Sequence, residues 1–228
     1  MNADFFSTGI YTVPDAARLT AVSTGRIRRW LRGYRYMHRE KSYESPPLWH
    51  GQWEPIDHSL ALGFLDLIEI RFVDAFLKAG VSWAMLRKAR QKAHTLFQVS
   101  HPFCTQHFVT DGREIFVELH DEREQPSLVE IVKWQQVFGN IIKPFLKELE
   151  FGGQAGVIRW WPLGEKRSVV LDPTRNFGRP IVATHGVPTE VLASAARTSG
   201  SIVEVTRWFD VAEREVRDAV EYEQRLAA

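Results

Sequence analysis

Arginine side chains are concentrated in one short segment near the N-terminus. Residues 16–41 contain a single acid, Glu40, and many basic residues, namely Arg18, Arg26, Arg28, Arg29, Arg32, Arg35, Arg39 and Lys41. Guanidinium groups form paired hydrogen bonds with phosphate oxygens or with the edge of guanine. Clustered cations also neutralise phosphates and release their counterions. The segment therefore has the chemistry of a nucleic-acid binder.

Other groups of reactive residues give weaker indications. His101, Cys104 and His107 have a spacing typical of metal ligands, but no fourth ligand is evident, and a packed thiol is the favoured interpretation of Cys104. The GGQAG run at 152–156 lacks the lysine that follows the last glycine of a nucleotide-binding loop. No serine or cysteine lies in a recognisable nucleophile motif. We therefore expect no enzyme activity, no metal site and no cofactor.

Three acids lie in the apolar segment 59–79. Asp66, Glu69 and Asp74 occur there together with Arg71 and Lys78. Charges of both signs at helical spacing are typical of a solvated helix face. We therefore expect these carboxylates to be exposed.

The composition indicates a soluble globular protein. Its 228 residues are 44% hydrophobic and 12% aromatic, which suffices for a substantial core, and the net charge is +1. No apolar run approaches the roughly 18 residues of a membrane span, and the N-terminus lacks signal-peptide features. The single cysteine excludes an intrachain disulfide. We expect a cytoplasmic protein with no membrane partner.

The basic segment has the pattern of two short helices. Pro14 suits the first turn of a helix over 14–20. Ser23 or Thr24 can cap a second helix, which Gly33 ends because glycine tolerates a positive φ. Its apolar positions follow helical spacing and predict an inward face of Ile27, Trp30 and Leu31. Two such helices joined by a tight turn predict a helix-turn-helix.

A weak hairpin signal follows over 34–53 and would form a wing. In a helix-turn-helix the second helix enters the major groove, where Arg26 could reach a base edge and the other cations could bind phosphates. The small residues Ser23 and Thr24 would let the backbone approach the duplex. The predicted DNA-binding residues are Ser23, Thr24, Arg26, Arg28, Arg29, Arg32, Arg35, Arg39 and Lys41.

The rest of the chain is predicted to be mainly helical with small β hairpins, an α+β fold. Apolar spacing predicts helices over 59–79, 82–99, 127–149, 188–197, 201–208 and 212–225. An Asp-Gly pair between apolar runs predicts a hairpin over 107–119. Pro144 is expected to kink its helix, and a short strand is expected over 155–163.

The N-terminal run "YTVPDAARLTAVSTGRIRRWLRG" resembles the first helix-turn-helix of MerR-type winged-helix regulators. The family's usual pattern is Y-T-x-x-E-x-A, then L-T-G-V-S, then an arginine followed by two aromatics. Here Asp15 replaces the glutamate, Ala21 the turn glycine and Arg29 the first aromatic. The resemblance implies that Arg28 binds phosphate and that Trp30 packs inside.

The C-terminal run "NFGRPIVATHGVPTEVLASAARTSGSIVEVTRWFDVAEREVRDAVEYE" resembles a small domain of unknown function found in many bacterial antitoxins. The matching motif, G-x-P followed by a hydrophobic-Pro pair, comprises Gly178, Arg179, Pro180, Val187 and Pro188. The usual G-T-R is replaced by Thr184, His185 and Gly186. The resemblance implies a structural or partner-binding role for the motif.

The middle of the chain, including "LGFLDLIEIRFVDAFLKAGVSWAMLRKA", resembles VapB-type antitoxins, which pair with PIN-domain ribonuclease toxins. The resemblance implies an N-terminal winged helix-turn-helix domain with its following helices (1–100), a connecting region (101–160) and a C-terminal three-helix domain (161–228). It also implies a type II antitoxin that binds double-stranded operator DNA, represses transcription, and silences a PIN-domain toxin by direct binding.

The C-terminal helices are expected to contact protein rather than DNA, because their acids would repel phosphate; these are Glu213, Glu215, Asp218, Glu221 and Glu223. A homodimer is expected because winged-helix proteins act on two half-sites through a two-fold axis. Its interface could use the 127–149 helix, which bears Trp134, Phe138 and Phe145, or the C-terminal domain. A plain core role for that helix is equally compatible with its pattern.

Two alternatives remain open from the sequence. One is a MerR-like ligand-sensing regulator without a toxin partner, whose pocket would be formed by Trp83, Phe97, Phe103, Phe108, Phe116 and Trp134. The other is an adaptor that sequesters a nuclease without binding DNA.

Overall fold

The computed structural model describes residues 5–121, 128–153 and 156–227. The chain divides into an N-terminal unit, residues 11–143, and a C-terminal unit, which combines residues 1–10 with 144–228. The predicted boundaries lay after residues 100 and 160. Helix α6 packs on α5, and the compact units divide at Pro144.

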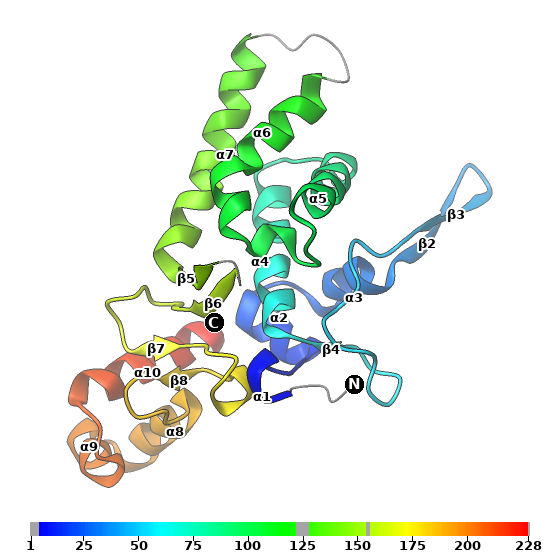
Figure 1. Ribbon diagram of the computed structural model, residues 1–228. Coiled ribbons are helices and arrows are strands. Elements are labelled where there is room, and N and C mark those ends of the chain that lie inside the picture. The colour runs from blue at the N-terminus through cyan, green and yellow to red at the C-terminus, as the bar shows by residue number, and fades with distance from the viewer. Residues whose placement is uncertain (1–4, 122–127, 154–155, 228) are drawn as a thin grey trace. The chain divides into compact units, whose positions relative to one another are not determined.

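Both units are mainly helical and contain short antiparallel strand pairs, in agreement with the predicted α+β class (Figure 1). The N-terminal unit contains β1 (Tyr11–Thr12), α2 (Val13–Thr20), α3 (Thr24–Arg32), β2 (Tyr34–His38), β3 (Lys41–Ser45), β4 (Ala61–Leu62), α4 (Phe64–Lys78), α5 (Trp83–Phe97), η1 (Pro102–Cys104) and α6 (Gln106–Asp121). Helix α7 (Leu128–Glu148) spans the boundary between the units. In the part of the chain that the structure describes, no helix has the length and apolarity to cross a bilayer.

Helices α2 and α3 confirm the two predicted N-terminal helices. Thr12 and Asp15 form a reciprocal capping box at the start of α2, with Pro14 in its first turn. The hydroxyl of Ser23 accepts a hydrogen bond from the backbone N–H of Arg26 and caps α3. Gly33, with a φ of 72°, ends α3 as predicted.

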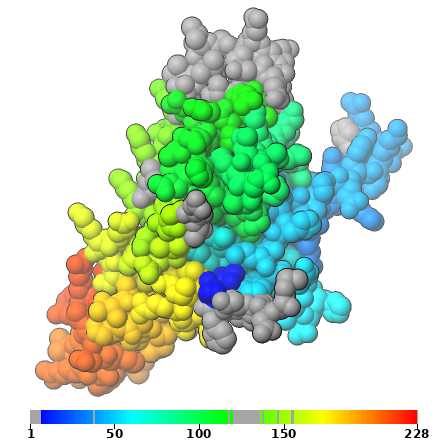
Figure 2. All heavy atoms as spheres, viewed as in Figure 1, coloured from blue at the N-terminus to red at the C-terminus, as the bar shows by residue number. Residues whose placement is uncertain are grey.

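Strands β2 and β3 form a hairpin, which confirms a hairpin after α3 but ends it at Ser45 rather than at residue 53. The register pairs Tyr34 with Ser45 and His38 with Lys41. Arg39 and Glu40 occupy the turn with positive φ values of 47° and 64°, the combination that a type I′ turn requires. Figures 1 and 2 show the hairpin projecting from the helices of its unit.

Helices α4 and α5 confirm the next two predicted helices, with a later start for α4. Residues 61–62 form β4, which pairs with β1, so α4 begins at Phe64. The hydroxyl of Ser82 caps α5 by accepting from the backbone N–H of Met85.

The predicted 107–119 hairpin is wrong, because this segment forms helix α6. Its buried residues recur every three or four positions and face an aromatic cluster that includes Phe76 and Phe138; they are Phe108, Gly112, Ile115, Phe116 and Leu119. A Cβ on Gly112 would lie 2.8 Å from the ring of Phe108 and 3.0 Å from that of Phe138. The glycine therefore allows close helix packing and does not form a turn.

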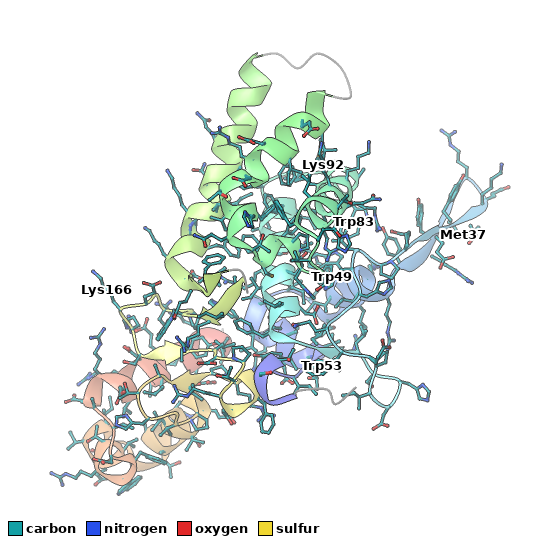
Figure 3. The ribbon with its side chains drawn as sticks, viewed as in Figure 1. Met37, Trp49, Trp53, Trp83, Lys92 and Lys166 are labelled. Carbon is teal, nitrogen blue, oxygen red and sulfur yellow. The ribbon has the colours of Figure 1, made fainter. Side chains whose placement is uncertain are left out.

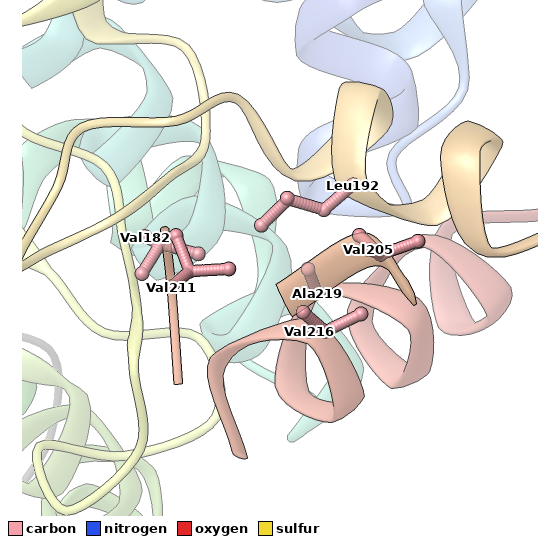
Figure 4. Packing of buried hydrophobic residues seen from close by; sticks show 6 residues of the cluster. All are labelled: Val182, Leu192, Val205, Val211, Val216 and Ala219. Carbon is pink, nitrogen blue, oxygen red and sulfur yellow. The ribbon is translucent and has the colours of Figure 1, made fainter. Parts of the chain in front are cut away.

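The C-terminal unit contains α1 (Phe5–Thr8), β5 (Leu149–Phe151), β6 (Val157–Trp160), β7 (Val169–Val170), η3 (Asn176–Gly178), β8 (Ile181–Val182), α8 (Thr189–Ser199), α9 (Ile202–Phe209) and α10 (Glu213–Ala227). Strand β6 and the last three helices confirm the predicted elements. Strands β7 and β8, absent from the sequence prediction, pair beside these helices. The core between the helices is aliphatic and consists of Val182, Leu192, Val205, Val211, Val216 and Ala219 (Figure 4).

Replacement of Gly112 by alanine should destabilise the protein by about 1–3 kcal/mol, because the added methyl group overlaps the Phe108 and Phe138 rings. Urea unfolding followed by circular dichroism measures the effect. The matched control is Gly139→Ala in α7, where a Cβ would meet nothing within 4 Å. That variant should gain up to about 1 kcal/mol from helix propensity. Equal effects of the two substitutions would contradict the packing role of Gly112.

Candidate nucleic-acid interface

Helix α3 separates an apolar face from a basic one. Ile27, Trp30 and Leu31 are buried, as predicted. Arg28, Arg29 and Arg32 are exposed. The guanidinium of Arg29 lies over the Tyr34 ring at 5.7 Å, and Nη2 of Arg32 donates to the carbonyl oxygen of His58 at 2.8 Å. The exposed guanidinium groups of this helix are therefore partly ordered on the surface.

Arg26 differs from the other α3 arginines because a carboxylate holds it. Its Nη1 lies 2.6 Å from Oδ1 of Asp74, and its guanidinium stacks over Trp30 at 4.9 Å. Lys78 pairs with the second oxygen of Asp74 at 2.8 Å. The carboxylate of Asp74 is nearly buried, so the expectation that it would be solvated is wrong. Arg26 therefore joins α3 to α4.

The start of α3 offers little side chain to a partner. Ser23 is exposed, but its hydroxyl is used in the helix cap, and Thr24 is half-buried. Gly25 follows them at the surface, where a Cβ would meet nothing within 4 Å. The backbone at this end of α3 is therefore accessible.

The hairpin adds cations and aromatic rings to the exposed surface. Arg35, Arg39 and Lys41 are exposed along it. The sequence analysis missed its exposed apolar side chains, which are Tyr34, Tyr36, Met37 and Tyr43. The rings of Tyr36 and Tyr43 stack across the two strands at 5.6 Å. Met37 is 67% exposed, and Figure 3 shows it on the hairpin away from the helices of this unit.

A buried carboxylate fixes the chain that follows the hairpin. Asp66 is fully buried, which contradicts the expectation that it would be solvated. It accepts hydrogen bonds from Nε1 of Trp49 at 2.8 Å, from the backbone N–H of Gln52 at 2.9 Å and from that of Gly63 at 2.8 Å. Nε2 of His101 lies 2.8 Å from the same carboxylate. A loop, the start of α4 and the segment before η1 therefore meet at one side chain.

A second buried carboxylate lies one helical turn further along α4. Glu69, also fully buried and also expected to be solvated, accepts from Nε of Arg90 at 2.7 Å. Arg90 also donates to the carbonyl oxygens of Leu48 and Ser100. The pair thus ties α5 to α4 and to two loops.

Cys104 is a packed thiol, as the sequence analysis favoured. Its Sγ lies 3.4 Å from the carbonyl oxygen of Leu65 and 3.4 Å from Oε2 of Glu69. Burial and the adjacent Glu69 carboxylate raise the pKa of the thiol well above its usual value. His107 is exposed and stacks on Phe97 at 5.7 Å. Across the described ranges no three His, Cys, Asp or Glu residues are arranged to hold a metal ion.

The aromatic residues of the middle segment pack against each other. Phe103, Phe108 and Phe116 are buried, and the rings of Phe103 and Phe108 are 4.4 Å apart. Trp83 stacks on Trp30 at 6.4 Å. The side chain of Trp134, also assigned to the proposed pocket, lies outside the described residues. The described rings therefore pack on one another or on neighbouring aromatic side chains.

The G-x-P motif and the Val-Pro pair of the C-terminal unit form a turn beside its core. Gly178 is buried with a φ of 80°, and the backbone N–H of Val182 donates to the carbonyl oxygen of Val187. Pro188 forms a bridge to Ile181. Val187 packs on the aliphatic core. The remaining members of the motif are Pro180, which is buried, and Arg179, which is exposed. Nη1 of Arg179 lies 3.9 Å from Oε1 of Glu190.

The acids of α10 are used inside the C-terminal unit. Glu215 and Asp218 are buried. Glu215 accepts from the backbone N–H of Ala212, and Asp218 accepts from Nε of Arg167 at 2.7 Å. Arg167 also bonds Glu221, and this hydrogen bond lowers the pKa of Glu221 below its usual value. Two of the five acids therefore cannot form the repelling surface that the sequence suggested.

Comparisons with known proteins bear on the whole chain. No protein-family model matches it. A curated protein of Mycobacterium tuberculosis, named "Putative antitoxin VapB45", is 27% identical over 95% of this chain and 94% of its own length. This similarity supports an antitoxin role.

The fold also has a counterpart among solved structures. The crystal structure of Rv2018 from Mycobacterium tuberculosis matches with a TM-score of 0.68 and 19% identity, over 92% of this chain and 96% of that one. At this identity the likeness shows a shared fold.

Replacement of Asp66 by asparagine should destabilise the protein by about 3 kcal/mol or more, because an amide group would face donors that now bind a carboxylate. Urea unfolding monitored by tryptophan fluorescence measures the loss. Asp111→Asn, an exposed change in α6, should shift the unfolding free energy by less than about 0.5 kcal/mol. A D66N protein as stable as D111N would exclude Asp66 as the anchor of this region.

Proposed function

We propose that this protein is the antitoxin of a type II toxin–antitoxin system, that it binds its operator DNA as a homodimer, and that it neutralises a PIN-domain ribonuclease by direct binding. The similarity to the VapB45 protein over nearly the whole chain is the observation that carries the antitoxin role. The exposed basic face of α3 and the adjoining hairpin support the DNA-binding part.

In the proposed DNA complex, α3 lies in the major groove and the hairpin acts as a wing. Arg28, Arg29 and Arg32 face outward from α3 and would contact phosphates or base edges. Ser23 and Thr24 would let the start of α3 approach the duplex. The cations of the hairpin would bind the flanking backbone; they are Arg35, Arg39 and Lys41.

We assign Arg26 a positioning role in place of the base contact suggested by the sequence. Its ion pair with Asp74 holds the first turn of α3 against α4, and its stacking on Trp30 orients the guanidinium. A base contact would require this pair to break and would leave Asp74 with Lys78 alone.

The C-terminal unit is the proposed site of protein contacts. Helix α9 presents Val203 and Trp208 to solvent at 50% and 60% exposure. Exposed tryptophans are enriched among residues that dominate binding energy in protein interfaces. The acids of α10 are largely satisfied within the unit, so the case for protein contacts here depends on the apolar residues of α9.

The ligand-sensing alternative is not favoured. Its proposed pocket residues, where the structure describes them, pack on one another or on neighbouring rings. The curated relative is named as an antitoxin.

Arg28→Ala should weaken binding to all DNA sequences alike and reduce the salt dependence, lowering the slope of log K against log salt by about 1, because one phosphate contact is lost. Fluorescence anisotropy with the DNA upstream of the gene, at several salt concentrations, measures both quantities. Arg113→Ala, an exposed change in α6, is the matched control and should leave the slope unchanged. Salt-independent binding by the unmodified protein would remove the DNA-binding proposal.

Trp208→Ala should weaken binding to a PIN-domain toxin encoded beside this gene by at least about tenfold, because a large exposed ring leaves the interface. Titration calorimetry with the purified toxin measures the change, and light scattering reports whether the homodimer persists. Ile56→Ala removes an exposed apolar side chain from the N-terminal unit and serves as the control. Unchanged toxin affinity with a dissociated dimer would assign α9 to dimerisation instead.

A further inference from the structure

A pocket of about 460 Å³ lies within the N-terminal unit, where the chain leaving the hairpin meets α5. Its walls are formed by the loop 46–50, by one face of α5 and by Ser100. A volume of this size is typical of small-molecule sites. None of the residues assigned above to the DNA interface lines this pocket.

The charged side chains that line the pocket are arginines. Its charged and titratable lining residues are Arg87, Arg90, His50 and His94, and no carboxylate is among the described residues that line it. Arg90 is neutralised by Glu69 at 2.7 Å. The charge of Arg87 is therefore the one that most needs a counter-ion.

Arg87 is held in place by neutral groups only. Its Nη1 donates to the carbonyl oxygen of Pro47 at 3.0 Å, and its Nη2 donates to that of Pro46 at 2.8 Å and to Oγ of Ser45 at 3.3 Å. The guanidinium lies over the Trp83 ring at 5.4 Å. Within the described chain it pairs with no carboxylate, and its Nε–H is bonded to nothing. Burial lowers its pKa, although Tyr34 acts in the opposite direction.

A guanidinium bonded only to neutral groups keeps its full positive charge and attracts an anion more strongly than one paired with a carboxylate. Three of the five N–H donors of Arg87 bind the chain, so its Nε–H and the second hydrogen of Nη1 remain for the oxygens of a phosphate group. His50, His94 and Gln91 are exposed at the same pocket and add further donors. The guanidinium of Arg90 lies over the ring of Trp49, and that of Arg87 lies over the ring of Trp83. Both tryptophans are labelled in Figure 3.

We propose that this pocket binds a phosphate group, with Arg87 as its principal ligand. The phosphate belongs either to a small phosphorylated molecule or to the DNA backbone beside the hairpin. Because Arg87 bonds the residues that directly follow β3, an occupied pocket also fixes the base of the hairpin. Phosphate binding itself does not depend on the proposed function; only the DNA source does.

The test uses inorganic phosphate and the full chain, with no DNA present. A ¹H–¹⁵N NMR titration should show saturable shifts of the Arg87 Nε–H and the Trp49 indole N–H signals. Gln91→Glu places a carboxylate in the pocket at the same side-chain length and should weaken phosphate binding at least about tenfold. Gln106→Glu, exposed on α6, is the same change outside the pocket and should alter the affinity less than twofold.

Arg87→Gln should abolish the saturable shift of the Trp49 indole N–H, whereas Lys88→Gln, exposed on the same helix, should not. If phosphate causes no saturable shift, or if both glutamate variants respond alike, the proposal is overturned.

A second arm identifies the source of the phosphate. If Gln91→Glu weakens DNA binding and phosphate competes with DNA, the backbone supplies the group. If DNA affinity is unchanged in Gln91→Glu, the pocket serves a small phosphorylated molecule. Because the phosphate titration contains no DNA, failure of the pocket and failure of the DNA-binding proposal give different results.

Discussion

The carboxylate of Asp66 is the constraint on which the N-terminal unit depends. It lies out of solvent and binds the Trp49 indole, two backbone N–H groups and the His101 ring. A buried carboxylate is tolerated only when its oxygens are satisfied, so these partners must stay in place together. The loop after the hairpin, the start of α4 and the segment before η1 are held together by this requirement. The position of the hairpin depends on it in turn.

The arginines of the N-terminal unit differ in what balances their charge. Arg26 and Arg90 pair with Asp74 and Glu69, and these pairs join helices. Arg28 and the hairpin cations face solvent, where they cost little and remain available to an anionic partner. Arg87 belongs to neither group, because it is partly buried and bonded to neutral acceptors only. This intermediate state is the physical basis of the phosphate-site proposal.

The C-terminal unit uses its charges in the same internal way. Arg167 binds Asp218 and Glu221 and so ties the loop before β7 to α10. Two of the α10 acids are buried, and Trp208 and Val203 of α9 are among the exposed large apolar side chains of this unit.

The sequence by itself determined the helices with clear caps and periodic apolar faces. Ser23, Ser82 and Gly33 act locally, and their effects do not depend on distant residues. The outward arginines of α3 were predictable for the same reason. Helix α6 was not, because Asp111-Gly112 is a good turn signal and only the rings of Phe108 and Phe138 require a glycine there.

The tertiary structure alone decided which charges are buried. Asp66, Glu69 and Asp74 have the spacing of a solvated helix face, and their partners Trp49, His101, Arg90 and Arg26 lie far away in sequence. Helical periodicity predicts which residues share a face of one helix. It does not predict whether another element places an opposite charge or a hydrogen-bond donor beside that face. The free energy of burying a carboxylate is set by those distant donors, and only the folded chain brings them together.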